Sequence, residues 1–149
     1  HVCCQKTIAF ASYFSNYRVA ILRRSSTDLA KTTRVTFYKI CPPDLYDESR
    51  GGFRSDARGT LRFTNGSEFL FLHLDDYDDN VVRGLEINMA FIDQAEEVGE
   101  YEKWQLEEWK KWERGSNRKV GSNTVRLIIM ITDSMDKVTF KQCTLLKSD

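Results

Sequence analysis

Apolar and polar residues follow one another in blocks whose periods predict helices and strands in turn. Gln5 to Phe14 has the length and spacing of a short helix, and Tyr17 to Arg24 has the β-branched, apolar centre of a buried strand. Ser25 is placed as a helix cap three residues before Asp28, and apolar residues then recur at helical spacing until the proline pair at Pro42. The chain therefore opens as helix, strand and helix.

The clearest local pattern further along is a hairpin. Gly59 to Leu74 consists of two alternating runs around Asn65-Gly66, a dipeptide that suits the positive φ angles of a tight turn between antiparallel strands. The polar, glycine-containing residues 44–58 before it are predicted as a loop, and the acidic residues 75–86 after it as a second, exposed loop.

Three more apolar runs follow in the second half of the chain. Ile87 to Ile92, residues 124–133 and residues 137–146 have the composition of strands. Between the first two, the charged stretch from Gln94 to about Arg114 carries interspersed aromatic residues, which predicts a helix with an aromatic face for packing or for a partner. Because strands and helices alternate, we expect an α/β fold with a mainly parallel sheet, flanked by helices and interrupted by the hairpin.

Composition limits the class of protein. The 149 residues, 41% of them hydrophobic, predict one domain, residues 1–149, with a substantial core. Positive and negative residues number 22 each, so the whole chain offers no gross electrostatic reason to bind nucleic acid or membrane. The apolar runs are too short to cross a bilayer and no signal segment opens the chain, so we expect a soluble protein without a membrane partner.

The cysteines indicate the redox state of the protein's surroundings, and the first residue indicates whether the chain is a fragment. Cys3, Cys4, Cys41 and Cys143 fit no zinc-ligand spacing, and the two adjacent thiols are poorly placed to join each other, so reduced structural thiols are favoured. The chain begins with His1 rather than Met, which favours a fragment or a processed chain.

Asp93, at the end of a run that resembles a buried strand, is the first candidate for chemistry. In an open α/β sheet the ligand lies beyond the carboxyl ends of the strands, where a carboxylate could meet a metal-bound phosphate. The alternative is that Asp93 only caps a following helix, since aspartate is favoured there.

Two basic positions are further candidates. Lys6 and Thr7 have the residue types that end a phosphate-binding loop, although Gln5 stands where a glycine is needed for the backbone to wrap phosphate. Arg83 lies beside a glycine in the loop before the strand of Asp93, from which it could reach a phosphate on a neighbouring subunit; a solvated arginine is the alternative. With only two histidines, the chain offers no metal-binding pair and no convincing triad, and His73 is predicted as a strand residue.

Taken in order, three segments resemble a known family. "YRVAILRRSSTDLAKTTRVTFYKICPPDLY", "FTNGSEFLFLHLDD" and "VVRGLEINMAFIDQAEEV" together resemble the ATPase domain of bacteriophage terminase large subunits, the motors that pump DNA into procapsids. The resemblance covers roughly residues 5–98, and its strength lies in the order of the segments. Residues 99–149 stay unassigned, and we expect no nuclease domain like that of the family within residues 1–149.

The resemblance implies a P-loop NTPase-like core that uses ATP and Mg²⁺. Lys6 and Thr7 match the lysine and hydroxyl of the phosphate-binding loop, and Asp93 matches the Walker B aspartate that holds Mg²⁺, usually through water. Arg83 matches the loop position from which such motors are thought to supply an arginine finger to a neighbour. Thr132 and Asp133 would end the strand that carries the coupling motif. The fold is expected to be truncated, because the chain lacks the glycines of the loop and the strand before them.

Gln94 departs from the family pattern, which commonly has a glutamate at this position to polarise the attacking water. Either Glu96 or Glu97 takes that part, or Gln94 orients the water, as a glutamine does in some GTPases. Hydrolysis would otherwise be slow or absent.

The resemblance also implies partners and a location. They are double-stranded DNA, a homo-oligomeric ring, the portal, the small terminase subunit and the host cytoplasm, where the protein would associate with the procapsid during packaging. Arg114, Arg118 and Lys119 are the candidates for DNA contact. Two alternatives stay open. One is a catalytically inactive α/β binding or assembly domain with a degenerate nucleotide site, and the other is a small secreted domain with disulfides.

Overall fold

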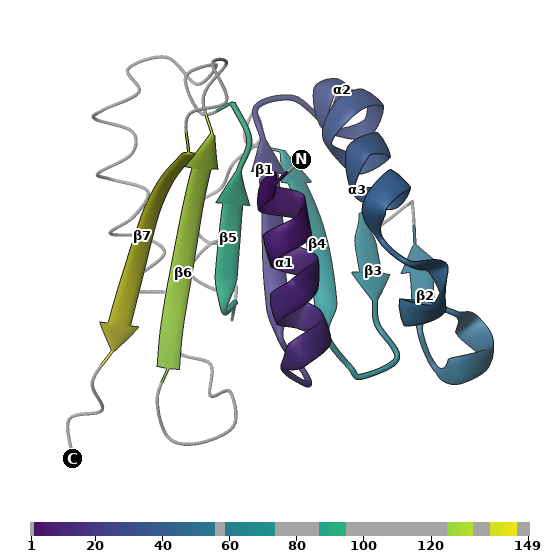
Figure 1. The fold of residues 1–149 in the computed structure, drawn as a ribbon. Helices are drawn as coiled ribbons and strands as arrows, with labels where there is room; N and C mark the ends of the chain where they lie inside the picture. Colours follow the sequence, from purple (N-terminus) through teal and green to yellow (C-terminus); the bar gives the residue numbers. More distant parts are fainter. Residues whose placement is uncertain (1, 56–58, 74–86, 95–124, 133–137, 146–149) are drawn as a thin grey trace.

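The structure, a computed structural model, describes residues 2–55, 59–73, 87–94, 125–132 and 138–145, the last two ranges by their backbone course (Figure 1). The helical segments are α1 (Val2–Tyr13), α2 (Ser26–Asp28), the π-helical η1 (Leu29–Thr33), α3 (Arg34–Ile40) and the 3-10 turns η2 (Pro43–Leu45) and η3 (Glu48–Arg50). The strands are β1 (Arg18–Arg23), β2 (Phe53–Ser55), β3 (Thr60–Arg62), β4 (Glu68–His73), β5 (Met89–Ile92), β6 (Val125–Thr132) and β7 (Val138–Leu145).

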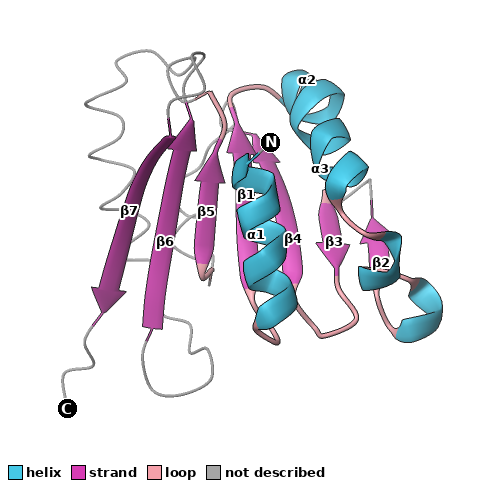
Figure 2. Ribbon diagram, viewed as in Figure 1, coloured by secondary structure: helices cyan, strands magenta, loops and turns pink. Residues whose placement is uncertain are grey.

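These strands form one seven-stranded sheet in the order β2-β3-β4-β1-β5-β6-β7 (Figure 2). The central strands β4, β1, β5 and β6 are parallel, and the pairs β2-β3, β3-β4 and β6-β7 are antiparallel. The α/β class is therefore confirmed, whereas the expectation of a mainly parallel sheet is wrong, because the sheet is mixed. The reason is connection length, since a parallel pair needs a crossover of a dozen or more residues and these outer strands are joined by shorter links.

The predicted helix after β1 is confirmed together with its cap. Ser25 has extended backbone (φ −108°, ψ 150°), and its hydroxyl accepts a hydrogen bond from the backbone N–H of Asp28. The helical path then runs through α2, η1 and α3 and ends at Ile40. Cys41 is extended because a residue before proline avoids the helical region, here ahead of Pro42.

The hairpin around Asn65-Gly66 is also confirmed, with Gly66 at φ 86°. Its turn is fastened to the end of α1, because the Asn65 amide donates to the carbonyl of Ala11 (2.7 Å) and the Ser67 hydroxyl donates to the same carbonyl (2.8 Å). Residues 44–58 differ from the predicted loop, since they contain η2, η3 and the edge strand β2. Backbone hydrogen bonds hold this segment against the rest of the protein. In one of them the Thr64 N–H donates to the Leu45 carbonyl (2.7 Å).

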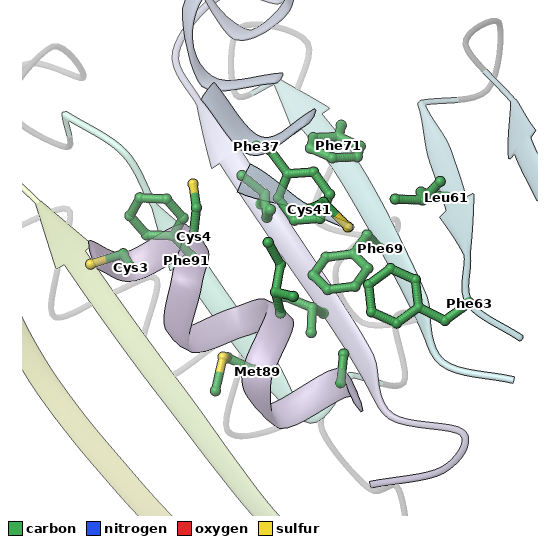
Figure 3. Close-up of a cluster of buried hydrophobic side chains, with 14 of the residues drawn as sticks. Cys3, Cys4, Phe37, Cys41, Leu61, Phe63, Phe69, Phe71, Met89 and Phe91 are labelled. Atoms are coloured by element: carbon green, nitrogen blue, oxygen red, sulfur yellow. The ribbon is translucent and has the colours of Figure 1, made fainter. Parts of the chain in front are cut away.

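One apolar core lies between the helices and a single face of the sheet (Figure 3). Phe37 of α3 is fully buried, and its ring lies 4.8 Å from that of Phe69 and 5.3 Å from that of Phe71, both on β4. From α1, Cys3, Cys4, Ile8 and Ala11 enter the same core. Alternate residues of β1 face this core. The last residue of the strand continues the alternation, so its side chain lies on the same face of the sheet.

The direction of α1 relative to the sheet places one end of this helix near the ends of the strands. α1 joins β1 through a short turn and runs back along it, so the N-terminus of α1 lies at the carboxyl ends of the parallel strands (Figure 1). No helix among the described residues is long and apolar enough to cross a membrane. The predicted acidic loop at 75–86 and nearly all of the predicted aromatic helix at 94–114 lie outside the described residues.

Candidate functional site

Asp93 and Gln94 directly follow β5, at the carboxyl end of the parallel strands. The backbone N–H of Asp93 donates to the carbonyl of Leu22 (2.9 Å), so β5 stays joined to β1 for one residue beyond its last strand residue. This hydrogen bond holds the backbone of Asp93, and therefore the base of its side chain, beside the end of β1. A carboxylate is thus presented where two parallel strands of the sheet terminate.

The Asp93 carboxylate is held from the helical layer by Thr33. The Thr33 hydroxyl donates to Oδ2 of Asp93 at 2.6 Å, and Thr33 is 3% exposed whereas the Asp93 side chain is 22% exposed. One side of the carboxylate is therefore fixed by a buried hydroxyl, and part of the group remains open to water.

Arg23, the last residue of β1, lies at the centre of this site. It follows Val19 and Ile21 on the face of the strand that is turned toward the helices, and its side chain is only 9% exposed. One guanidinium nitrogen lies 3.6 Å from Oδ2 of Asp93, and the guanidinium also donates to Oε1 of Gln94 and to the Thr32 hydroxyl. A nearly buried cation therefore bridges the end of β5 and the helical layer.

The π-helical turn η1 explains how two adjacent threonines both reach the site. A π-helix is wider than an α-helix and appears often at functional sites. Thr32, near its end, accepts from Arg23 and donates to the carbonyl of Asp28 (2.6 Å), and the next residue, Thr33, bonds Asp93. The widened turn thus presents consecutive hydroxyls to the arginine and to the carboxylate.

The backbone at Gln94 is unusual. Its φ is +49°, in the left-handed region that residues other than glycine rarely adopt. Such conformations cost about 1–3 kcal/mol and cluster at ligand and active sites, where the surrounding structure enforces them. The side chain of the same residue accepts the hydrogen bond from Arg23.

Two buried thiols lie near the same edge, at the start of α1. Burial raises the pKa of Cys4 to about 11 and also raises that of Cys3, and in both cases the Asp93 charge adds to the rise. Because the thiolate is the nucleophile and metal ligand, these protonated thiols are unsuited to either task at neutral pH.

Lys6 and Thr7 lie within α1, which begins at Val2. Thr7 is fully buried and its hydroxyl donates to the carbonyl of Cys4 (2.8 Å), while Lys6 is exposed. The structure therefore brings neither residue to the end of a loop, and it leaves the Thr7 hydroxyl engaged inside the helix. Arg83, Glu96, Glu97 and the basic residues Arg114, Arg118 and Lys119 lie outside the described residues, as does Asp133.

Asp93 has features that suit Mg²⁺ in a nucleotide site. Such an ion keeps several waters and takes one or two protein carboxylates together with phosphate oxygens, so a single, partly exposed aspartate is sufficient. Among the described residues, no group of three or more His, Cys, Asp or Glu could hold a metal ion by itself. The described part of the sheet edge also contains no glycine-rich loop to hold phosphates. The described residues would fit a water-mediated contact to Mg²⁺ through Asp93.

Sequence reasoning missed Arg23, Thr32 and Thr33. One signal was available for Arg23, since an arginine that ends a buried parallel strand must emerge at the same edge as Asp93.

No family model and no curated protein matches this chain. The geometry at the ends of β1 and β5 is therefore the feature that indicates a function.

Proposed function

We propose that the chain is part of the ATPase of a viral DNA-packaging motor, a terminase large subunit, in which ATP hydrolysis drives DNA translocation. The observation that carries the proposal is the Asp93 carboxylate at the carboxyl end of β5, held by Thr33 and Arg23 beside the end of a parallel neighbour. This is the part of an α/β sheet where phosphate ligands bind.

The proposal includes a P-loop NTPase-like fold. Its support is the set of four parallel strands with α1 packed so that the helix N-terminus reaches the same edge as Asp93. Helix N-termini at such an edge favour anions, because their free N–H groups and dipole point outward. The proposal assigns no phosphate contact to Lys6 or Thr7, since both lie inside the helix.

Asp93 is the residue that holds Mg²⁺, through water. The ion, when bound, neutralises charge on the phosphates and helps to align them. Gln94 or one of Glu96 and Glu97 orients or activates the attacking water, and Arg83 acts on a neighbour's phosphates. Double-stranded DNA, a ring of identical subunits, the portal, the small terminase subunit and a location in the host cytoplasm belong to the same proposal.

A second function is supported by the same edge. Thr7 is buried within α1, and the Asp93 carboxylate is already paired with an arginine. These observations suit a binding or assembly domain of the same α/β architecture whose nucleotide site is degenerate. That domain would need no hydrolysis to hold a partner.

Hydrolysis distinguishes the two functions. On the full product of the gene that encodes this chain, ATP turnover with Mg²⁺ is measured with and without linear double-stranded DNA. The motor function predicts turnover that DNA stimulates and that Asp93→Ala abolishes, while Asp44→Ala, an exposed carboxylate on η2, leaves it unchanged. Absence of turnover in the parent would contradict the motor and favour the assembly domain.

A further inference from the structure

We propose that Arg23 is a positioning residue of this site, which fixes the Asp93 carboxylate and sets the orientation of the Gln94 amide without itself touching nucleotide. The inference rests on the proposed function for its catalytic consequence. Its structural content can be tested separately, because the arginine-held pair exists whether or not ATP is the ligand.

The Arg23 guanidinium contacts several acceptors at once. Arginine offers five N–H donors in a rigid, planar fork, so it can serve several acceptors at fixed angles, which a lysine ammonium cannot. Arg23 uses this fork on Asp93, Gln94 and Thr32, which come from two separate segments of the chain. The side chain is 9% exposed, so water competes little for these donors.

Arg23 also restricts the orientation of the Gln94 amide. A guanidinium only donates, so it must face the carbonyl oxygen Oε1 and never the NH₂ group. The Arg23 contact therefore selects one of the two amide orientations and turns Nε2 away from the guanidinium. At the same residue the backbone is held at φ +49°, so the direction in which the side chain leaves the chain is also restricted. Arg23 thus determines which polar end of Gln94 is available to a ligand or a water.

Arg23 also supplies a positive charge beside the Asp93 carboxylate. Asp93 is partly buried, and a buried carboxylate without a counter-charge is costly, so loss of the arginine would release the carboxylate to seek water or another partner. Thr33 would still donate its hydrogen bond, but a neutral donor does not supply the counter-charge of a cation. We therefore expect the Asp93 carboxylate to change position when Arg23 is removed.

A double-mutant cycle in thermal unfolding tests the arrangement without any nucleotide. Gln94→Glu is introduced into the parent and into Arg23→Met. With Arg23 present, the new carboxylate gains a charge-assisted bond to the guanidinium, and in Arg23→Met this bond is lost while the negative charge of Asp93 stays nearby. The change in Tm caused by Gln94→Glu should thus be more favourable by about 3 °C or more when Arg23 is present. An equal change in both backgrounds would overturn the inference.

Two further variants keep the cycle decisive if Arg23→Met does not fold. Arg23→Lys retains the charge but not the fork, so in that background Gln94→Glu should lose part of its advantage. Arg18→Met is the matched control, because Arg18 lies at the opposite end of the same strand, where it pairs with Glu68 at 3.0 Å. Gln94→Glu should give the parental change in Tm in that background. If Arg18→Met alters the change in Tm caused by Gln94→Glu as much as the Arg23 variants do, the effect is not specific to Arg23 and the inference is contradicted.

The catalytic consequence is read from the kinetics of ATP hydrolysis. A positioning residue that does not touch nucleotide predicts a fall in kcat of about tenfold or more in Arg23→Lys, with little change in KM. Arg18→Met should change neither constant. A rise in KM with kcat unchanged would show that Arg23 binds nucleotide directly and would overturn the positioning role. If the parent hydrolyses no ATP, the proposed function fails and the catalytic role fails with it, while the Tm cycle still decides whether Arg23 holds the pair.

Discussion

The Thr33 hydroxyl donates to the Asp93 carboxylate at 2.6 Å, across sixty positions of sequence. One partner comes from a π-helical turn after the first strand and the other from the residue after β5. The bond therefore links the helical layer to the carboxyl edge of the sheet at the point where the proposed chemistry takes place. It also makes the geometry of the site depend on the packing of the helix that carries Thr33.

Removal of this hydroxyl should lower stability. Thr33→Val keeps the shape of the buried side chain and deletes the donor, so the free energy of unfolding should fall by about 1.5–3 kcal/mol, the usual contribution of a hydrogen bond to a charged group. Urea unfolding measures the change. Thr27→Val makes the same chemical substitution at an exposed position of α2 and should alter stability by less than about 0.5 kcal/mol. Equal losses in the two variants would contradict the importance of the Thr33 bond.

The helix that carries Thr33 depends on Phe37. This ring is fully buried against Phe69 and Phe71, so Phe37→Ala should cost about 3–5 kcal/mol through lost burial and the cavity left behind. The measurement is the midpoint of denaturant unfolding. Val35→Ala, at a residue of the same helix that is 43% exposed, provides the comparison and should cost less than about 1 kcal/mol. A loss below 1 kcal/mol at Phe37 would mean that the helix is not anchored to β4 in solution.

Alkaline pH should destabilise the fold through the buried thiols. Burial raises the pKa of Cys4 to about 11 and that of Cys41 to about 12 from an ordinary value of 9.0, so the unfolded chain loses these protons first as pH rises. Their contribution is complete below pH 9 and is lost progressively toward pH 11–12, where the folded state also ionises. Burial raises the pKa of Tyr17 as well, which acts in the same direction.

The comparison of stability at pH 8 and pH 10.5 checks this prediction. Cys41→Ala removes one titrating group, so the fall in stability between the two pH values should be smaller in this variant than in the parent, even though the variant is less stable overall. A fall of the same size in both proteins would show that Cys41 does not contribute to it.

The sequence predicted the elements that depend on local chemistry. The Ser25 cap and the turn at Asn65-Gly66 were identified because a capping hydroxyl and an Asn-Gly pair act through their nearest neighbours. The strands that pass through Ile21 and Phe91 were identified from continuous apolar runs. The mixed sheet was not predicted, although the short span at residues 133–137 already disfavoured a parallel crossover to the last strand.

The site was predicted only in part, for a different reason. Asp93 was found because an acidic residue that ends an apolar run stands out in the sequence. Arg23 and Thr33 were missed because their roles depend on which strand lies beside β5 and on the width of the helix at η1, and neither is encoded in hydrophobic periodicity. Lys6 and Thr7 are candidates by residue type and by the resemblance, and the structure places them inside a helix.

The most direct test of the account is magnesium-dependent ATP binding at Asp93. Calorimetric titration with ATP, in Mg²⁺ and in a chelator, is carried out on the full gene product and on Asp93→Asn, with the exposed Asp44→Asn as the matched control. The account predicts that Mg²⁺ tightens binding in the parent and in Asp44→Asn, and that Asp93→Asn loses about tenfold or more of that gain. Binding that Mg²⁺ does not affect, or an Asp93→Asn protein with the parental dependence on Mg²⁺, would contradict it.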